Sequence, residues 1–235
     1  IVWAHHMYTV GLPVAGELFF MYATMLIAVP TGVKVFNWIT TMWRGALSFE
    51  TPMLFCIGFL VLFTIGGFTG LMLSIAPSDF QYHDSYFVVA HFHYVMVAGA
   101  VFSMTAADYF WLPKWCGKMY NEAMGKTQFW ISFIGFNLTF FPQHFVGLAG
   151  MPRRIPDYAL QFADFNMMSS IGAFIYGASQ ILFLYNVIAT IVAGKPVSDE
   201  KVWDGAEGLE WTVPTPAPYH TFETPPKIDP AHAHS

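Results

Sequence analysis

The sequence predicts an all-α, polytopic transmembrane helix bundle with a soluble acidic tail. The 235 residues are 55% hydrophobic and only 11% charged, whereas a typical soluble domain carries about 25% charged residues. Mean hydropathy is +0.48. Several apolar runs also exceed the roughly 20 residues that a helix needs to cross a bilayer. Because backbone groups in lipid must be hydrogen-bonded internally, runs of this length are expected to be helices.

Five runs are predicted to span the membrane within a transmembrane part that extends from residue 1 to residue 193. The expected spans are about 17–42, 52–76, 86–112, 127–148 and 168–193. Residues 194–235 are rich in proline and acidic side chains, so they are expected to form a solvated tail. The chain opens on an apolar stretch, and we expect it to be a piece of a longer protein.

The distribution of basic residues predicts the orientation of the bundle. The basic residues fall in alternate loops, as loops on the inner face of a membrane do: Arg44, then Lys114, Lys118 and Lys126, and then Lys195 and Lys201. The tail is therefore expected on the inner side.

Arg153 and Arg154 stand side by side in a loop that this orientation places outside. Positive charge there runs against the topology rule, so we expect a fixed anion to hold the pair. The alternative is an exposed pair that the topology tolerates.

His91 and His93 are separated by one residue within an otherwise apolar span. Successive residues of a helix are about 100° apart, so the two side chains point roughly 200° apart. They cannot easily share one metal ion, but each can serve a different centre, and imidazole is a common axial ligand of haem iron. The alternative is a pair of hydrogen-bonded structural histidines.

Two further groups of residues have side chains typical of metal ligands. His5 and His6 precede the first span, and adjacent imidazoles can converge on a copper ion where the backbone is not regularly helical. His83 and Asp84 precede the third span and suit a divalent cation. A chance pair in a loop and a polar helix entry are the respective alternatives.

The first span carries a polar stripe. Relative to Thr31, Thr24 lies about 20° and Lys34 about 60° around a helix. An ionisable group inside a span is a functional candidate, and protons are its usual passengers. Pro30 and Gly32 loosen the backbone beside the stripe and leave room for water. A lysine that snorkels to the inner interface is the alternative.

Four motifs identify a resemblance. These are WAHHMYTVG, IAVPTGVKVFNW, HDSYFVVAHFHYV and TFFPQHFVGLAGMPRR. With the spacing between them, they closely resemble the carboxyl-terminal half of subunit I of haem–copper cytochrome c oxidase, from residue 1 to about residue 191. The resemblance implies the second part of a twelve-span fold.

The resemblance implies the metal ligands of the oxygen-reducing centre. His5 and His6 match two of the three ligands of copper B. His91 matches the axial ligand of the high-spin haem, and His93 matches one axial ligand of the low-spin haem. Two haems, both expected to be of the A type, are implied.

Other residues match further parts of the family's machinery. His83 and Asp84 match the magnesium or manganese site, and Thr24, Thr31 and Lys34 match a proton path.

The arginine pair and an acidic residue match the surroundings of the haem propionates. These residues are Arg153, Arg154 and Asp79, so the propionates would be the fixed anion expected above.

The resemblance also implies partners and a location. These are the amino-terminal half of subunit I, on the same or a separate chain, subunit II with its dinuclear copper centre, subunit III, cytochrome c, dioxygen and membrane lipid, but no nucleic acid. The expected location is a bacterial plasma membrane or the mitochondrial inner membrane. Electrons from cytochrome c would reduce dioxygen to water, coupled to proton uptake and pumping.

Three other functions remain open at this stage. The nearest is a quinol-oxidising relative, in which asparagine often replaces the residues at Tyr94 and Asp84. A membrane transporter that uses Lys34 and the arginine pair would contain no haem. A structural membrane subunit with hydrogen-bonded histidines would contain no metal.

Overall fold

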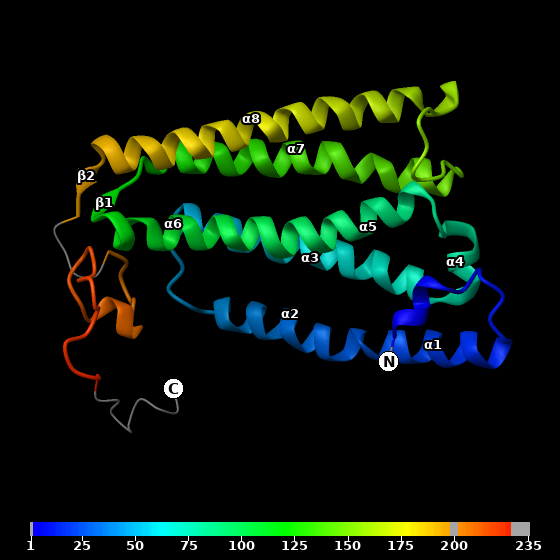
Figure 1. Cartoon of the computed structure of the whole chain (residues 1–235), viewed down its shortest axis with the longest axis horizontal. Coiled ribbons are helices and arrows are strands. Elements are labelled where there is room, and N and C mark those ends of the chain that lie inside the picture. The colour runs from blue at the N-terminus through cyan, green and yellow to red at the C-terminus, as the bar shows by residue number, and fades with distance from the viewer. Residues whose placement is uncertain (1, 198–201, 227–235) are drawn as a thin grey trace.

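The structure, a computed structural model, describes residues 2–197 and 202–226, and it consists of long helices that lie nearly side by side (Figure 1). The helices are α1 (Val14–Leu26), α2 (Ala28–Met42), α3 (Thr51–Ser74), α4 (Ala76–Tyr82), α5 (Tyr86–Met96), α6 (Ser103–Cys116), α7 (Glu122–Leu148) and α8 (Ala163–Ala193). Shorter elements are the 3-10 helices η1 (Trp3–His6), η3 (Leu160–Phe162) and η4 (Leu209–Trp211), the π-helix η2 (Val97–Phe102), and the strands β1 (Lys118–Met119) and β2 (Lys195–Pro196).

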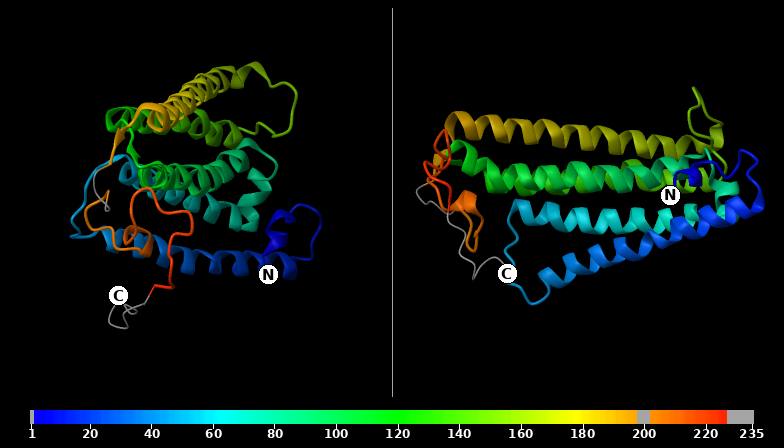
Figure 2. Two further views of the ribbon diagram at one scale, coloured as in Figure 1. Left: turned by 60° about the vertical axis from the view of Figure 1, so that its left-hand side comes forward. Right: turned by 60° about the horizontal axis from the view of Figure 1, so that its bottom comes forward.

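The helices pack in layers. Helix α8 lies along α7, α7 packs on α5, and α3 packs against both α5 and α6. Helices α1 and α2 form the opposite edge and diverge from α3 towards the end of α2 (Figure 2). Only 6% of the most apolar part of Val14–Met42 is buried within the chain. This edge is therefore open to lipid or to another polypeptide.

Within the described residues, four stretches are long and apolar enough to cross a membrane: Val14–Met42, Thr51–Ser74, Tyr86–Cys116 and Leu160–Ala193. The predicted count of five spans is therefore wrong by one. Helix α7, which contains the expected span 127–148, has 27 residues but is not apolar enough. Several of its polar side chains are buried within the bundle, among them Gln128, Ser132 and Thr139. Ser132 Oγ, for example, donates to Ser179 Oγ of α8 at 2.7 Å.

The first predicted span, 17–42, is not one regular helix. It consists of α1 and α2, which meet at Ile27. Pro30 has no backbone N–H, and its ring clashes with the carbonyl four residues earlier, that of Leu26. The helix is therefore interrupted at Ile27, close to Pro30 and Gly32, where the sequence predicted a loosened backbone.

The third predicted span, 86–112, continues to Cys116 and contains a π-helix. Its middle part, η2, lies between α5 and α6. The hydroxyl of Ser103 donates to Gly99 O at 2.5 Å, and that of Thr105 donates to Val101 O at 2.8 Å. These two hydroxyls supply hydrogen bonds to carbonyls of the π-helix, where the regular α-helical pattern is interrupted.

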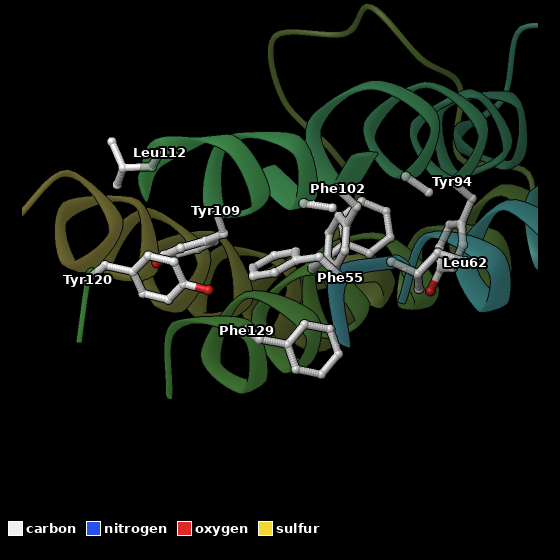
Figure 3. Packing of buried hydrophobic residues seen from close by; sticks show 11 residues of the cluster. Phe55, Leu62, Tyr94, Phe102, Tyr109, Leu112, Tyr120 and Phe129 are labelled. Carbon is white, nitrogen blue, oxygen red and sulfur yellow. The ribbon is translucent and has the colours of Figure 1, made fainter. Parts of the chain in front are cut away.

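The core is an aromatic cluster between α3, α7 and the continuous helical segment formed by α5, η2 and α6 (Figure 3). Phe55 lies at its centre, with its ring 5.5 Å from that of Phe102, 6.0 Å from that of Tyr109 and 5.1 Å from that of Phe129. Each of these four side chains is less than 5% exposed. The cluster packs α3, α6 and α7 against one another.

Part of the tail packs against the bundle, so the prediction of a solvated tail is wrong for that part. Trp211 is only 2% exposed, and Trp203 Nε1 donates to Phe110 O at 2.8 Å. Lys114, which was expected in a loop on the inner face, is buried at the end of α6, where its Nζ donates to Val213 O at 2.6 Å. Residues 198–201 and 227–235 of the tail lie outside the described residues.

The close approach of α7 and α8 depends on glycine. A Cβ on Gly172 would clash with the backbone of Leu138 and Thr139, and a Cβ on Gly135 would lie 2.6 Å from Tyr176 N. We therefore expect Gly172→Ala to lower the free energy of unfolding by about 1–3 kcal/mol, the usual cost of overpacking. Thermal unfolding of the purified protein in detergent, followed by circular dichroism, measures this loss.

Gly177→Ala is the matched control, because Gly177 lies on the same helix and an added Cβ there meets nothing within 4 Å. That variant should be as stable as the parent or more stable, since alanine is the better helix former. Equal losses in both variants would contradict the proposed role of Gly172.

Candidate functional site

A cavity of about 810 Å³ lies between η1, α1, α2, α3, α4 and α5. Its volume falls within the range of small-molecule and cofactor sites. Of the twelve residues that the sequence singled out, ten line it: His5, His6, Thr24, Thr31, Asp79, His83, Asp84, His91, Arg153 and Arg154. The other two, Lys34 and His93, do not.

The 3-10 helix η1 brings the first two histidines together at the cavity. His5 Nε2 lies 2.9 Å from His6 Nε2, and His5 Nδ1 lies 3.4 Å from Thr24 Oγ1 of α1. Burial lowers the pKa of His5, and the nearby imidazoles of His6 and His91 lower it further. Two ring nitrogens thus converge on one point, as a copper ion requires of its imidazole ligands.

Among the described residues, no three His, Cys, Asp or Glu side chains group closely enough to hold a metal ion. By itself the histidine pair offers two candidate ligands, fewer than a closed metal site needs. Tyr8, which is 1% exposed, helps to fix this segment, because its hydroxyl donates to Ser74 O at 2.9 Å. Sequence reasoning did not single out Tyr8.

His91 enters the same cavity from α5. Its Nδ1 lies 2.9 Å from Gly66 O and 3.1 Å from Thr69 Oγ1, both on α3. A carbonyl only accepts, so Nδ1 carries the proton and Nε2 keeps its lone pair. This is the arrangement that orients a metal-binding imidazole. Gly70 makes room for the ring, since a Cβ there would lie 2.9 Å from His91 Cε1.

The side chain of His93 points from α5 towards α7. Its Nδ1 donates to Val89 O at 2.7 Å, and its ring stacks on that of Phe140 with 4.1 Å between centroids. Nε2 is again the nitrogen with a free lone pair. The two imidazoles of α5 thus contact different neighbours, α3 for His91 and α7 for His93. Sequence reasoning did not single out Thr69 or Phe140.

The residues around the start of α5 form one polar network. His83 Nδ1 lies 3.0 Å from Asp79 Oδ2, and His83 Nε2 lies 3.7 Å from Asp84 Oδ2. Arg153 binds the other oxygen of Asp84, with its Nη2 2.7 Å from Oδ1. The hydrogen bond from Arg153 lowers the pKa of Asp84. Burial raises the pKa of Asp79, although His83 partly offsets that effect.

The backbone holds this network in place. Arg153 N donates to Asp84 O at 2.8 Å, and Tyr86 N donates to Met151 O at 3.0 Å. Asp84 and Arg154 both have positive φ, 52° and 61°, which costs conformational free energy. The loop that carries the arginines is thus fixed beside the start of α5. The carboxylate of Asp84 is an anion that holds Arg153.

The break between α1 and α2 interrupts the polar stripe of the first span. Thr24 lies on α1, whereas Thr31 and Lys34 lie on α2. The hydroxyl of Thr24 donates to Phe20 O at 2.6 Å, and that of Thr31 donates to Ile27 O at 2.9 Å. Both threonines line the cavity, whereas Lys34 is exposed on α2. Lys34 does not line the cavity that contains His5, His6 and His91.

Comparison with known proteins shows close relatives. A family model described as "Cytochrome C and Quinol oxidase polypeptide I" matches residues 1–175. The chain is 53% identical to cytochrome c oxidase subunit 1 of Cereibacter sphaeroides, over 99% of this chain and 42% of the relative. It is 49% identical to cytochrome c oxidase subunit 1 of Bacillus sp. (strain PS3), over 97% of this chain and 37% of the relative.

A solved structure shares the fold. The chain superimposes on a cryo-EM structure of a heme-copper terminal oxidase dimer with a TM-score of 0.74 and 18% sequence identity, over 83% of this chain and 40% of that one. The chain therefore spans about two fifths of the length of these proteins. The four apolar helices make it an integral membrane protein. The chain belongs to the cytochrome c and quinol oxidase polypeptide I family.

Proposed function

We propose that this chain is the carboxyl-terminal part of the catalytic subunit of a cytochrome c oxidase. The complex would reduce dioxygen to water with electrons from cytochrome c and couple this to proton uptake and pumping. One observation carries the proposal: His5, His6 and His91 line a single cavity, while His93, two residues further along α5, faces α7. One helix thus separates two imidazole sites.

The chain's residues fit the haem and copper that the family implies. His91 and His93 each use Nδ1 to donate to a carbonyl and keep Nε2 available. We assign His91 to a high-spin haem, His93 to a low-spin haem, and His5 and His6 to copper B. Both haems are proposed to be of the A type. When bound, these groups supply the electron transfer and the oxygen chemistry.

The polypeptide itself orients ligands and controls charge. Gly66 O and Thr69 Oγ1 fix the tautomer of His91. Arg154 lines the cavity and Arg153 is held against Asp84 beside it. These two cations, with Asp79, are proposed to surround the haem propionates.

His83 and Asp84 are proposed to bind magnesium or manganese. Arg153 occupies Asp84 Oδ1, which leaves Oδ2 and His83 Nε2 near one another. Because two protein ligands are too few for such an ion, we propose that subunit II and water complete the site.

Thr24, Thr31 and Lys34 are proposed to conduct protons from the inner side. The two hydroxyls line the cavity, and Lys34 lies on the open edge of α2. Large apolar side chains share this edge, among them Phe36 and Val33. We propose that the amino-terminal half of subunit I, on the same or a separate chain, covers it and connects Lys34 to the threonines.

The other proposed partners are subunit II with its dinuclear copper centre, subunit III, cytochrome c and membrane lipid, in a bacterial plasma membrane or the mitochondrial inner membrane. A reduced-minus-oxidised spectrum of the purified complex tests the cofactors. Oxidation rates with reduced cytochrome c and with a quinol then test the electron donor. Haem bands with fast cytochrome c oxidation support the proposal. The absence of haem, or oxidation of quinol alone, would contradict it.

The proposed haem ligands predict different effects of the two imidazoles of α5. His93→Asn should lose the low-spin haem band and retain carbon monoxide binding, because the ring that faces α7 is removed. His91→Asn should abolish carbon monoxide binding and retain the low-spin band. Optical spectra of the reduced complexes, with and without carbon monoxide, measure both. Identical spectra for the two variants would show that the imidazoles do not serve separate centres.

Another prediction concerns Lys34. Lys34→Met removes the only cation of α2, so proton delivery to the cavity should slow while the haem ligands stay unchanged. Static haem spectra should match the parent, and stopped-flow reduction of the high-spin haem should be slower. Lys118→Met is the control, because the Lys118 ammonium instead donates to Ile191 O at the end of α8. Parental reduction kinetics in Lys34→Met would rule out the path.

A further inference from the structure

We propose that Phe140 is a positioning residue that fixes the plane of the His93 imidazole and thereby tunes the low-spin haem. The inference rests on the proposed role of His93 as an axial ligand. It assigns to α7 a part in the site that the sequence motifs of α5 do not reveal.

The His93 ring is held by three contacts from two helices. Its Nδ1 donates to Val89 O, one turn earlier on α5, at 2.7 Å. The ring of Phe140 lies almost parallel to it, with 4.1 Å between centroids and 15° between planes. The ring of Phe92 lies on it at 4.5 Å and 29°. The Phe92 contact lies at the short end of the range for offset aromatic stacking, and the Phe140 ring lies closer still.

These contacts have different consequences for the imidazole. The hydrogen bond to Val89 O fixes the tautomer and the position of one ring atom, but the ring can still turn about that bond. Val89, Phe92 and His93 all belong to α5, so they move together. Phe140 belongs to α7 and is the contact that fixes the plane relative to the rest of the bundle. Supporting contacts of this kind orient metal ligands.

Phe140 is itself held firmly. Its ring packs on Phe136 with centroids 5.0 Å apart, and Phe136 is fully buried. Phe136 makes an edge contact with Tyr94 at 4.9 Å. The hydroxyl of Tyr94 donates to Asn137 Oδ1 at 2.7 Å, which ties α5 back to α7. These contacts hold the Phe140 ring against His93.

His91 is oriented differently. Its Nδ1 bonds to Gly66 O and Thr69 Oγ1 on α3, and among the described residues no aromatic ring stacks on it. Loss of the Phe140 ring should therefore alter one haem and leave the other unchanged. The angle of an axial imidazole plane determines the splitting of the iron d orbitals, so the g-values of the low-spin haem report it directly.

The experiment compares variants of the complete oxidase complex. Phe140→Leu and Phe140→Met remove the flat ring and keep an apolar side chain, whereas Phe140→Tyr keeps the ring. Phe133→Leu is the matched control, since Phe133 is a partly buried phenylalanine two turns earlier on α7 that packs on Phe129 and Trp130. Electron paramagnetic resonance of the oxidised complex and optical spectra of the reduced complex are recorded at equal haem content.

We expect the leucine and methionine variants to shift the g-values and the optical band of the low-spin haem, with carbon monoxide binding unchanged. The tyrosine variant and the Phe133→Leu control should give parental spectra. Loss of the low-spin haem alone from both non-aromatic variants would also support the role. Parental g-values in an assembled non-aromatic variant, an equal shift in Phe140→Tyr, or loss of both haems together would overturn it.

His93→Asn separates this inference from the proposed function. If that variant keeps the low-spin haem, the axial assignment itself fails. If it loses the haem while Phe140→Leu leaves the spectra unchanged, only the role of Phe140 fails.

Discussion

The position of α5 between α3 and α7 determines where both imidazoles point. An α-helix places residues two apart on nearly opposite sides, so His91 and His93 become useful only when each side of α5 meets a partner. Glycine permits that close packing. A Cβ on Gly66 of α3 would lie 2.9 Å from Val95 N, and a Cβ on Gly147 of α7 would clash with Phe87 N. Each side then supplies its own support, a carbonyl and a hydroxyl for one ring and a phenyl ring for the other.

Much of the fold could be predicted from the sequence because lipid leaves few alternatives to a helix. The polar positions were harder to interpret. Helix α7 resembled a fifth span because most of its residues are apolar, but Ser132 and its other polar residues lower its apolarity, and α5 and α8 shield them from lipid. Trp211 was assigned to a solvated tail because proline and acidic residues surround it. Its burial depends on contacts with α6 that lie far away in the sequence.

The candidate site was predictable where the chemistry is local to a motif. His5 and His6 lie far from His91 in the sequence, and the fold brings all three to one cavity. Residues that act through another residue carried no such signal. Thr69 and Phe140 are ordinary side chains in their helices, and only the packing of α3 and α7 on α5 gives them a role. Candidate ligands are therefore easier to predict from a sequence than the groups that would orient them.

The π-helix η2 explains how the continuous helical segment α5–η2–α6 contributes both to the candidate site and to the core. Buried residues recur every four positions at Ala90, Tyr94, Ala98, Phe102 and Ala106. In a regular α-helix each such step advances about 40°, so four steps would carry the stripe by about 160° to the opposite side. A π-turn accommodates one extra residue and removes about 100° of that drift. The stripe stays on the face that packs against α3 and α7. Upstream of the π-turn, His91 and His93 keep the α-helical spacing that points them to different neighbours.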